Sequence, residues 1–162
     1  MIVTRGSDQV PITSSYDLRS DVGVLQNYGR LLIDLCASIP DGLVAFFTSY
    51  SYMEDLVSAW KDLGILDEIL KYKLIFIETK DVVETTLALD AFKRACNRGR
   101  GAVFLSVARG KVAEGIDFDR HFGRAVVMFG IPFQYTLSRV LRARLTYLRE
   151  KVRNDRGTLN SL

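Results

Sequence analysis

The chain has 162 residues, 48% of them hydrophobic and 25% charged, which are the proportions of an ordinary globular domain. This length suffices for one domain with its own core and excludes a complete two-domain motor. A net charge of +3 permits contact with nucleic acid without arguing for it. Since the sequence has neither a membrane-length apolar run nor a signal-peptide layout, we expect a soluble intracellular protein without a membrane partner.

The first third of the chain predicts an edge strand, a helix and a buried strand. Alternating apolar residues around 10–12, within a polar segment over 1–20, indicate a short edge strand that enters the domain. Apolar residues at helical spacing predict a helix over Asp21–Ile39. The apolar run Leu43–Phe47 has the length and composition of a buried strand.

Hydroxyl side chains follow this strand directly, at Thr48, Ser49 and Tyr50. They are natural N-caps of the next helix. The same hydroxyls, together with free backbone N–H groups, can also hold a nucleic-acid phosphate at the start of a helix. The rings of Tyr50 and Tyr52 can stack on bases, although Tyr52 fits equally well in the core beside the apolar stripe of that helix. Both interpretations stay open at this point.

Strands and helices alternate through the rest of the chain. We expect strands over Leu74–Ile77, Ala102–Ser106 and Ala125–Phe129, and helices over Asp81–Arg98 and Thr136–Lys151. The apolar residues expected to face inward on the first of these helices are Val82, Leu87, Leu89, Phe92 and Cys96. The alternation predicts an α/β fold: a doubly wound, mostly parallel sheet with helices on both faces.

The cysteines Cys36 and Cys96 lie far apart in the sequence, and His121 is the only histidine. Because metal sites need clusters of such ligands, we expect neither a zinc site nor an iron–sulfur cluster from this chain alone. Both cysteines are most simply explained as buried, reduced thiols.

The loop that follows the strand Ala102–Ser106 combines glycines with charges of both signs. Its glycines allow backbone to approach a phosphate or sugar closely, its carboxylates can accept from ribose hydroxyls or from an arginine, and its cations can pair with phosphates. The residues concerned are Arg109, Gly110, Lys111, Glu114, Gly115 and Asp117. An ordinary strand–loop–helix junction with solvated charges would contain similar residue types.

The whole segment 99–118, GRGAVFLSVARGKVAEGIDF, resembles motif V with its Va extension in the second motor domain of the XPD-type helicases. These are the superfamily-two DNA helicases of transcription factor TFIIH, and their motif is close to GRGA-x-x-LSVARGKV-x-EGIDF. The segment 44–53, VAFFTSYSYM, is similar to motif IV of the same family. The resemblance covers residues 1–151 and implies an incomplete RecA-like fold.

The resemblance also implies a function. Such a chain would be a fragment of an ATP-dependent 5′→3′ DNA helicase subunit of TFIIH, which acts in the nucleus in nucleotide excision repair and in transcription initiation by RNA polymerase II. Its cofactors would be ATP and Mg²⁺, and its partners single-stranded DNA and other TFIIH subunits. Residues implied to face ATP are Glu114, Gly115 and Asp117; those implied to contact DNA are Thr48, Ser49, Tyr50, Ser106, Arg109 and Lys111.

The match ends before motif VI, and residues 152–162 depart from the family pattern. We therefore expect an entry segment over 1–20, a partial motor domain over 21–151 and a disordered tail over 152–162. Motif I, the DEAH box and the iron–sulfur cysteines of the family belong to an N-terminal half that this sequence does not contain. Because phosphoryl transfer needs those parts together, we expect no catalytic residue here and no activity from the chain alone.

Two further expectations follow from this ending. A sheet that lacks its last strands leaves apolar surface uncovered around Val126, Val127 and Phe129, which predicts a marginally stable, self-associating chain. The alternative to a helicase fragment is a non-catalytic interaction module that binds a TFIIH regulatory subunit.

Overall fold

The protein is described by a computed structural model that covers residues 1–13, 15, 18–108, 110, 118–131 and 142–148. The chain divides into two compact units, Met1–Pro132 and Phe133–Leu162. In the second unit, residues 142–148 are helical and exposed, as expected within the predicted helix Thr136–Lys151. The remainder of that helix and the tail lie outside the described residues. Within these bounds, no helix is long and apolar enough to cross a membrane.

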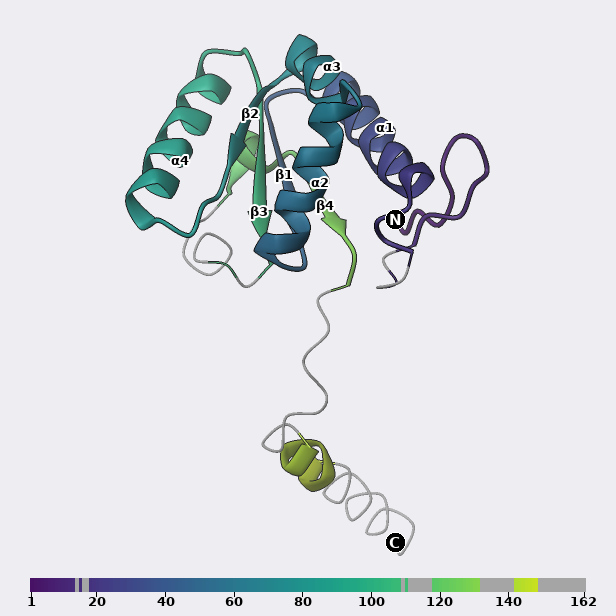
Figure 1. Ribbon diagram of the computed structural model, residues 1–162. Helices are drawn as coiled ribbons and strands as arrows, with labels where there is room; N and C mark the ends of the chain where they lie inside the picture. The colour runs from purple at the N-terminus through teal and green to yellow at the C-terminus, as the bar shows by residue number, and fades with distance from the viewer. Residues whose placement is uncertain (14, 16–17, 109, 111–117, 132–141, 149–162) are drawn as a thin grey trace, which may run out of the picture. The chain divides into compact units, whose positions relative to one another are not determined.

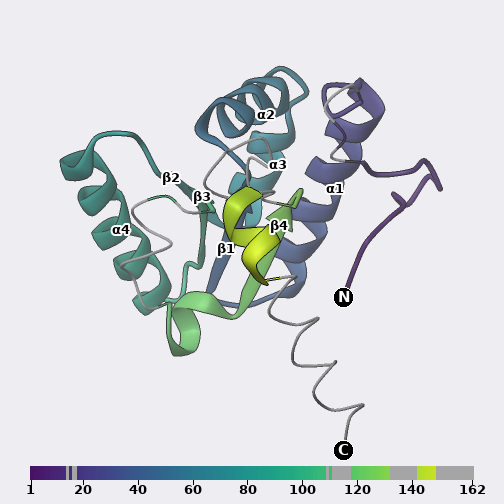
Figure 2. The same cartoon turned by 90° about the horizontal axis from the view of Figure 1, so that it is seen from below.

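The first unit is built around a parallel sheet. Its elements are α1 (Val22–Ser38), β1 (Gly42–Phe47), α2 (Tyr50–Asp62), α3 (Ile65–Tyr72), β2 (Leu74–Ile77), α4 (Val82–Asn97), β3 (Ala102–Val107), the short 3₁₀ helix η1 (Arg120–Gly123) and β4 (Ala125–Phe129). The four described strands pair in the order β2-β3-β1-β4, and every pairing is parallel. Helices α1, α2 and α3 cover one face of the sheet and α4 covers the other (Figure 1), and the end-on view in Figure 2 separates the same layers. The predicted α/β, doubly wound architecture is confirmed.

Three helices begin at side-chain caps that the sequence supplies. Asp21 Oδ1 accepts from the amides two and three residues later, at 2.9 and 3.4 Å, and so starts α1. Asp81 Oδ1 starts α4 in the same way, at 2.7 and 2.9 Å. Ser49 Oγ accepts from the amide three residues later at 3.2 Å and starts α2. Each bond satisfies a donor that the first turn leaves free, which explains why these helices begin close to the predicted positions.

Aromatic contacts hold the helices to both faces of the sheet. On the larger side, the ring of Phe129 stacks on Phe47, with centroids 5.1 Å apart, and meets the edge of Trp60 at 5.6 Å. On the smaller side, Phe92 of α4 contacts Phe104 of β3 at 5.6 Å in an edge-to-face arrangement. Such pairs add specific geometry to the burial of large apolar surfaces, so they fix the two layers against the strands.

The inward face of α4 differs from the predicted stripe. Val82 and Leu87 were expected inside but are exposed, whereas Leu89 is buried. The inward position one turn before Leu89 belongs to Thr85, whose hydroxyl donates to Thr79 O at 2.9 Å and accepts from Thr79 N at 3.1 Å. The helical stripe is therefore Thr85, Leu89, Phe92, Ala95 and Cys96. An apolar count alone misses an inward threonine that is satisfied by hydrogen bonds to the preceding loop.

The predicted edge strand over residues 10–12 is wrong for the described sheet. Arg5 and Pro11 instead form an isolated antiparallel bridge outside the sheet. Asp8, at the tip of this hairpin, accepts from Asn27 Nδ2 of α1 at 3.0 and 3.1 Å. Pro11 has no N–H to donate to a sheet ladder, and Asp8 directs the segment onto a helix.

Strand β4 forms one edge of the four described strands, and its two faces differ in burial. Phe129, expected near the uncovered edge, is instead buried against Phe47, and Val127 is half-buried. On the other face of β4, Val126 is 60% and Met128 46% exposed. This face agrees with the predicted uncovered apolar surface at this strand. Because α4 packs over β2 and β3, it leaves that face of β4 open.

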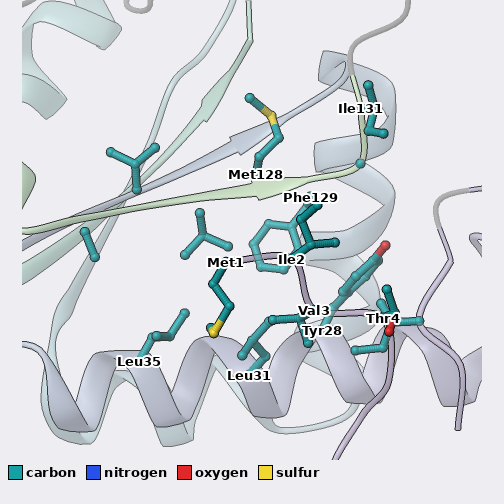
Figure 3. A pocket seen from close by; sticks show the side chains of 15 residues that line it. Met1, Ile2, Val3, Thr4, Tyr28, Leu31, Leu35, Met128, Phe129 and Ile131 are labelled. Atoms are coloured by element: carbon teal, nitrogen blue, oxygen red, sulfur yellow. The ribbon is translucent and has the colours of Figure 1, made fainter.

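A cavity of about 600 Å³ lies beside β4, and its lining is mostly apolar. Figure 3 shows Leu31 and Leu35 of α1 on one side, Phe129 on the other, and Met1 with Ile2 between them. Apolar surface is therefore present around β4, both in this cavity and on the exposed face of the strand.

We predict that Val126→Lys and Met128→Lys keep the chain monomeric at concentrations where the unchanged chain self-associates. An added charge on an edge strand opposes pairing with a second molecule. Because both side chains are exposed, the free energy of unfolding should change by no more than about 0.5 kcal/mol. Sedimentation velocity over a wide range of concentration measures the association.

The control is Val83→Lys, which adds the same charge at an exposed apolar site on α4. If Val83→Lys suppresses association as strongly as the β4 variants, net charge and not the β4 surface is responsible. A chain that is monomeric without any substitution also contradicts the prediction.

Candidate functional site at the carboxyl ends of the strands

The segments that follow β1, β2 and β3 are neighbours in space. In the parallel register, Phe47 pairs with Val107 and Ile77 pairs with Leu105, so the three strands end at one edge of the sheet. In Figure 1 this is the lower edge, to which the arrow of β3 points. The carboxyl edge is where open α/β sheets bind ligands. The sequence placed its candidate residues in two of these three segments.

Ser49 is exposed at this edge and caps α2, while Thr48 beside it is half-buried. The capping interpretation is therefore confirmed for Ser49. A hydroxyl that accepts one bond still has its own proton to donate, so capping does not prevent Ser49 from binding a phosphate oxygen. Negative ligands are also favoured at the start of a helix.

The two tyrosines of α2 have different environments. Tyr52 is only 2% exposed and lies in the core, so it does not offer its ring for base stacking. Tyr50 is half-buried, and its hydroxyl donates to Glu78 Oε1 at 2.7 Å. Burial, and then the hydrogen bond and negative charge of Glu78, raise the pKa of Tyr50 to about 12, so it stays a neutral donor near pH 7.

Glu78 joins these segments, although it is not among the site residues predicted from the sequence. It follows β2 directly and is only 1% exposed. Besides Tyr50, its carboxylate accepts from Ser106 Oγ at 2.6 Å and from Val107 N at 3.0 Å. An acidic residue at the end of an apolar strand, LIFIE, is the sequence signal that could have indicated it.

Ser106 and Gly110 also lie against Glu78. Ser106 is completely buried, so its hydroxyl serves Glu78 and offers DNA no surface in this structure. A Cβ on Gly110 would lie 2.5 Å from Glu78 Oε1 and 2.9 Å from Oε2, far closer than packing permits. The predicted close approach at Gly110 is therefore used by the protein's own carboxylate.

The structure thus brings together part of the predicted site. The predicted residues that it places at this edge are Thr48, Ser49, Tyr50, Ser106 and Gly110. Arg109, Lys111 and the predicted ATP-facing set (Glu114, Gly115 and Asp117) lie outside the described residues. None of the residues predicted to face ATP or DNA lines the cavity beside β4. In the described part of the chain, no group of His, Cys, Asp and Glu side chains is arranged to hold a metal ion.

The cysteines are buried on opposite faces of the sheet. Cys36 belongs to the core under α1, and Cys96 to the core under α4. Burial raises the pKa of each thiol to about 11, so both stay protonated near neutral pH. This agrees with their interpretation as buried thiols and separates them from the candidate site.

Comparison with known proteins defines the class to which this fold and site belong. A family model described as the helicase C-terminal domain matches residues 32–161, and the chain belongs to this family. The matched region contains the strands whose carboxyl ends form the candidate site. Its α/β sheet is consistent with the RecA-like fold of such domains.

The relatives place the chain more closely, with the XPD-type helicases. It is 62% identical over 157 residues to the "General transcription and DNA repair factor IIH helicase subunit XPD" of Arabidopsis thaliana, covering 97% of this chain and 21% of that protein. It is 57% identical to the corresponding XPD/RAD3 subunit of Saccharomyces cerevisiae, over 94% of this chain and 20% of the relative. A regulator of telomere elongation helicase 1 homolog of Anopheles gambiae is 40% identical over 82% of this chain and 14% of its own length. The chain therefore spans about a fifth of the XPD relatives.

We predict that Gly110→Ala destabilises the fold by about 1–3 kcal/mol, because its methyl group would collide with the Glu78 carboxylate. In a Glu78→Ala background the same substitution should cost at least about 1 kcal/mol less, since the contact with the carboxylate is gone and only the backbone Val107 O, 2.9 Å from the Cβ position, remains close. Urea unfolding of the four variants gives the coupling free energy. The control pair is Gly110→Ala with Leu89→Ala on α4, which should be additive. Additivity in both pairs would show that the contact with Glu78 does not restrict position 110.

Proposed function

We propose that this chain contributes half of the ATP cleft and half of the single-strand DNA groove to an ATP-dependent 5′→3′ DNA helicase. The observation that supports this most directly is the meeting of two segments at one sheet edge: the hydroxyl segment Thr48–Tyr50 and the end of β3, both held by Glu78. These segments are the counterparts of motifs IV and V in the resembled family. The high identity to helicase subunits supports the same assignment.

On the DNA side, phosphates would be bound at the start of α2. Ser49 is exposed there, and the half-buried Tyr50 presents part of its ring. Lys80, whose ammonium lies 5.9 Å from the centre of that ring and 3.8 Å from Glu54 Oε1, is a cation beside it that could exchange this exposed ion pair for a phosphate. Arg109 and Lys111, which follow β3 in the sequence, would supply further cations. Stacking on Tyr50 and phosphate contacts by hydroxyls and cations would bind single strands without reading their sequence.

On the nucleotide side, Glu114, Gly115 and Asp117 follow β3 and would face ATP. The chain has no GxxxxGK[ST] phosphate loop, and the described residues include no carboxylate cluster for a cation. The proposal therefore assigns the phosphate cradle and the Mg²⁺ ligands to the remainder of a longer protein. There, hydrolysis of bound ATP would supply the energy and Mg²⁺ would neutralise charge on the phosphates, while this chain would orient the nucleotide against the DNA groove.

The wider role would be that of a TFIIH subunit in the nucleus, acting in nucleotide excision repair and in transcription by RNA polymerase II. The names of the XPD relatives, which refer to general transcription, DNA repair and factor IIH, support this role. A second candidate function is a non-catalytic module that binds a TFIIH regulatory subunit, favoured by the exposed apolar face of β4. DNA-stimulated ATP hydrolysis by the full-length protein separates the two candidates, because only the first requires it.

We predict that Ser49→Asp in the full-length protein weakens binding of single-stranded DNA by about tenfold, or about 1.4 kcal/mol. Aspartate caps a helix as well as serine does, so the melting temperature should be preserved. Its negative charge, however, would repel a phosphate at the start of α2. Fluorescence anisotropy with a labelled oligonucleotide measures the affinity.

The matched control is Ser58→Asp, which places the same charge on the exposed surface of α2, about two and a half turns further along the helix. It should change the affinity much less. Equal weakening by both variants would mean that DNA responds to net charge and does not lie at the start of α2.

We also predict that Asp117→Asn in the full-length protein lowers ATP-driven unwinding by about tenfold or more, since a charge-assisted hydrogen bond contributes about 1.5–3 kcal/mol. The melting temperature should fall much less. A strand-separation assay and a thermal melt of the same preparation give the two quantities. A loss of unwinding that is explained entirely by loss of folded protein would assign Asp117 a structural role instead.

A further inference from the structure

The Glu78 carboxylate is buried, and its three hydrogen-bond donors come from two separate segments. Tyr50 belongs to the first turn of α2, whereas Ser106 and Val107 end β3. The backbone N–H of Glu78 in turn donates to Leu105 O of β3 at 2.8 Å. Glu78 therefore joins the end of β2 to the end of β3 and to the start of α2 by four hydrogen bonds. We call this set of hydrogen bonds the tie.

A buried carboxylate lowers the stability of the folded protein unless its oxygens accept hydrogen bonds from well-placed donors. Moving a carboxylate out of water costs several kcal/mol, which only well-placed donors offset. Apolar side chains of similar volume would fill the same space without that cost, as they do elsewhere between these strands. The carboxylate adds what apolar packing lacks: directional bonds that fix Tyr50 against Ser106.

The tie also reaches the loop that follows β3. Gly110 lies so close to both carboxylate oxygens that only a residue without a Cβ fits. Gly110 N donates to Val107 O at 2.7 Å, which turns the chain back over Glu78. The position of this turn therefore depends on where the carboxylate is held, and the carboxylate is held in part by Tyr50.

We propose that Glu78 is a positioning residue that couples the start of α2 to the loop after β3. This inference rests on the proposed function, in which DNA binds beside Ser49 and the nucleotide beside the loop that begins at Arg109. A displacement of Tyr50 on DNA binding is passed through Glu78 to Ser106 and Gly110. Binding of a single strand thereby changes the loop at the nucleotide, and Glu78 makes ATP hydrolysis responsive to DNA.

Three substitutions separate the hydrogen bonds of Glu78 from its charge. Glu78→Gln keeps the reach of the side chain: its amide oxygen can accept from Ser106 and Val107, and its NH₂ can donate to the Tyr50 oxygen. Glu78→Asp keeps the charge but is one methylene shorter, so it cannot reach both segments. Glu78→Ala removes both properties. Leu89→Ala, in the core under α4, is the control for a general loss of stability.

The first experiment measures, in the full-length protein, the ratio of kcat for ATP hydrolysis with and without single-stranded DNA. We expect this ratio to fall about tenfold for Glu78→Asp and Glu78→Ala, within the usual range of couplings between sites, and to be retained by Glu78→Gln and Leu89→Ala. A ratio that Glu78→Asp retains and Glu78→Gln loses would overturn the proposal, because charge and not the tie would then matter. Equal ratios in all variants would overturn it as well.

The second experiment does not depend on helicase activity. Amide hydrogen exchange followed by mass spectrometry should show faster exchange both at the start of α2 and at Val107–Gly110 in Glu78→Asp, and no such paired change in Glu78→Gln or Leu89→Ala. Faster exchange at only one of the two segments would overturn the coupling. If the exchange result is as expected but the unchanged protein shows no DNA-stimulated hydrolysis, the tie stands and the proposed function fails.

Discussion

The parallel pairing of β1 with both β3 and β4 is the constraint on which the structure depends. Parallel neighbours cannot be joined by tight turns, so each connection must cross a face of the sheet. The connection from β1 to β2 crosses β3 and runs toward the β2 end of the strand order. The connection from β2 to β3 runs in the opposite direction, toward the β4 end. Because such crossovers are right-handed, the reversal puts α2 and α3 on one face and α4 on the other. The parallel pairing itself brings the carboxyl ends of all four strands to one edge.

This constraint also explains why burial is unequal on the two faces of β4. The connection from β3 to β4 continues in the direction of the preceding crossover and therefore belongs on the face of α4. Among the described residues it supplies only η1, a single 3₁₀ turn. The side of β4 under α1 buries Phe129 in a ring stack, while the opposite side leaves Val126 and Met128 exposed. The unequal burial of β4 thus follows from the sheet order, in which α4 packs mainly over β2 and β3.

Much of this fold could be predicted from the sequence, because the strands of this parallel sheet appear as continuous apolar runs and helices carry their caps. The runs Leu43–Phe47, Leu74–Ile77 and Ala125–Phe129 are strands within a residue of their predicted bounds. Errors arose where a polar side chain decides the orientation. Thr85 faces inward because it bonds to the loop before its helix, and Asp8 holds its hairpin on α1. Neither contact leaves a periodic signal.

The candidate site was predicted in part for a related reason. Residues adjacent in sequence, such as Thr48 and Ser49, were found from their pattern, whereas Glu78 acts through Tyr50 and Ser106, each 28 residues away. The run LIFIE marks a glutamate at the end of a strand, but it does not indicate which other segments supply the donors of that glutamate. Gly110 is nevertheless a trace of Glu78 in the sequence, because a Cβ at position 110 would collide with the Glu78 carboxylate. The glycine was interpreted as leaving space for a ligand, whereas the structure fills that space with the glutamate. A glycine beside a binding loop therefore indicates only that something approaches closely, and the approaching group can be the protein's own side chain that gives the loop its position.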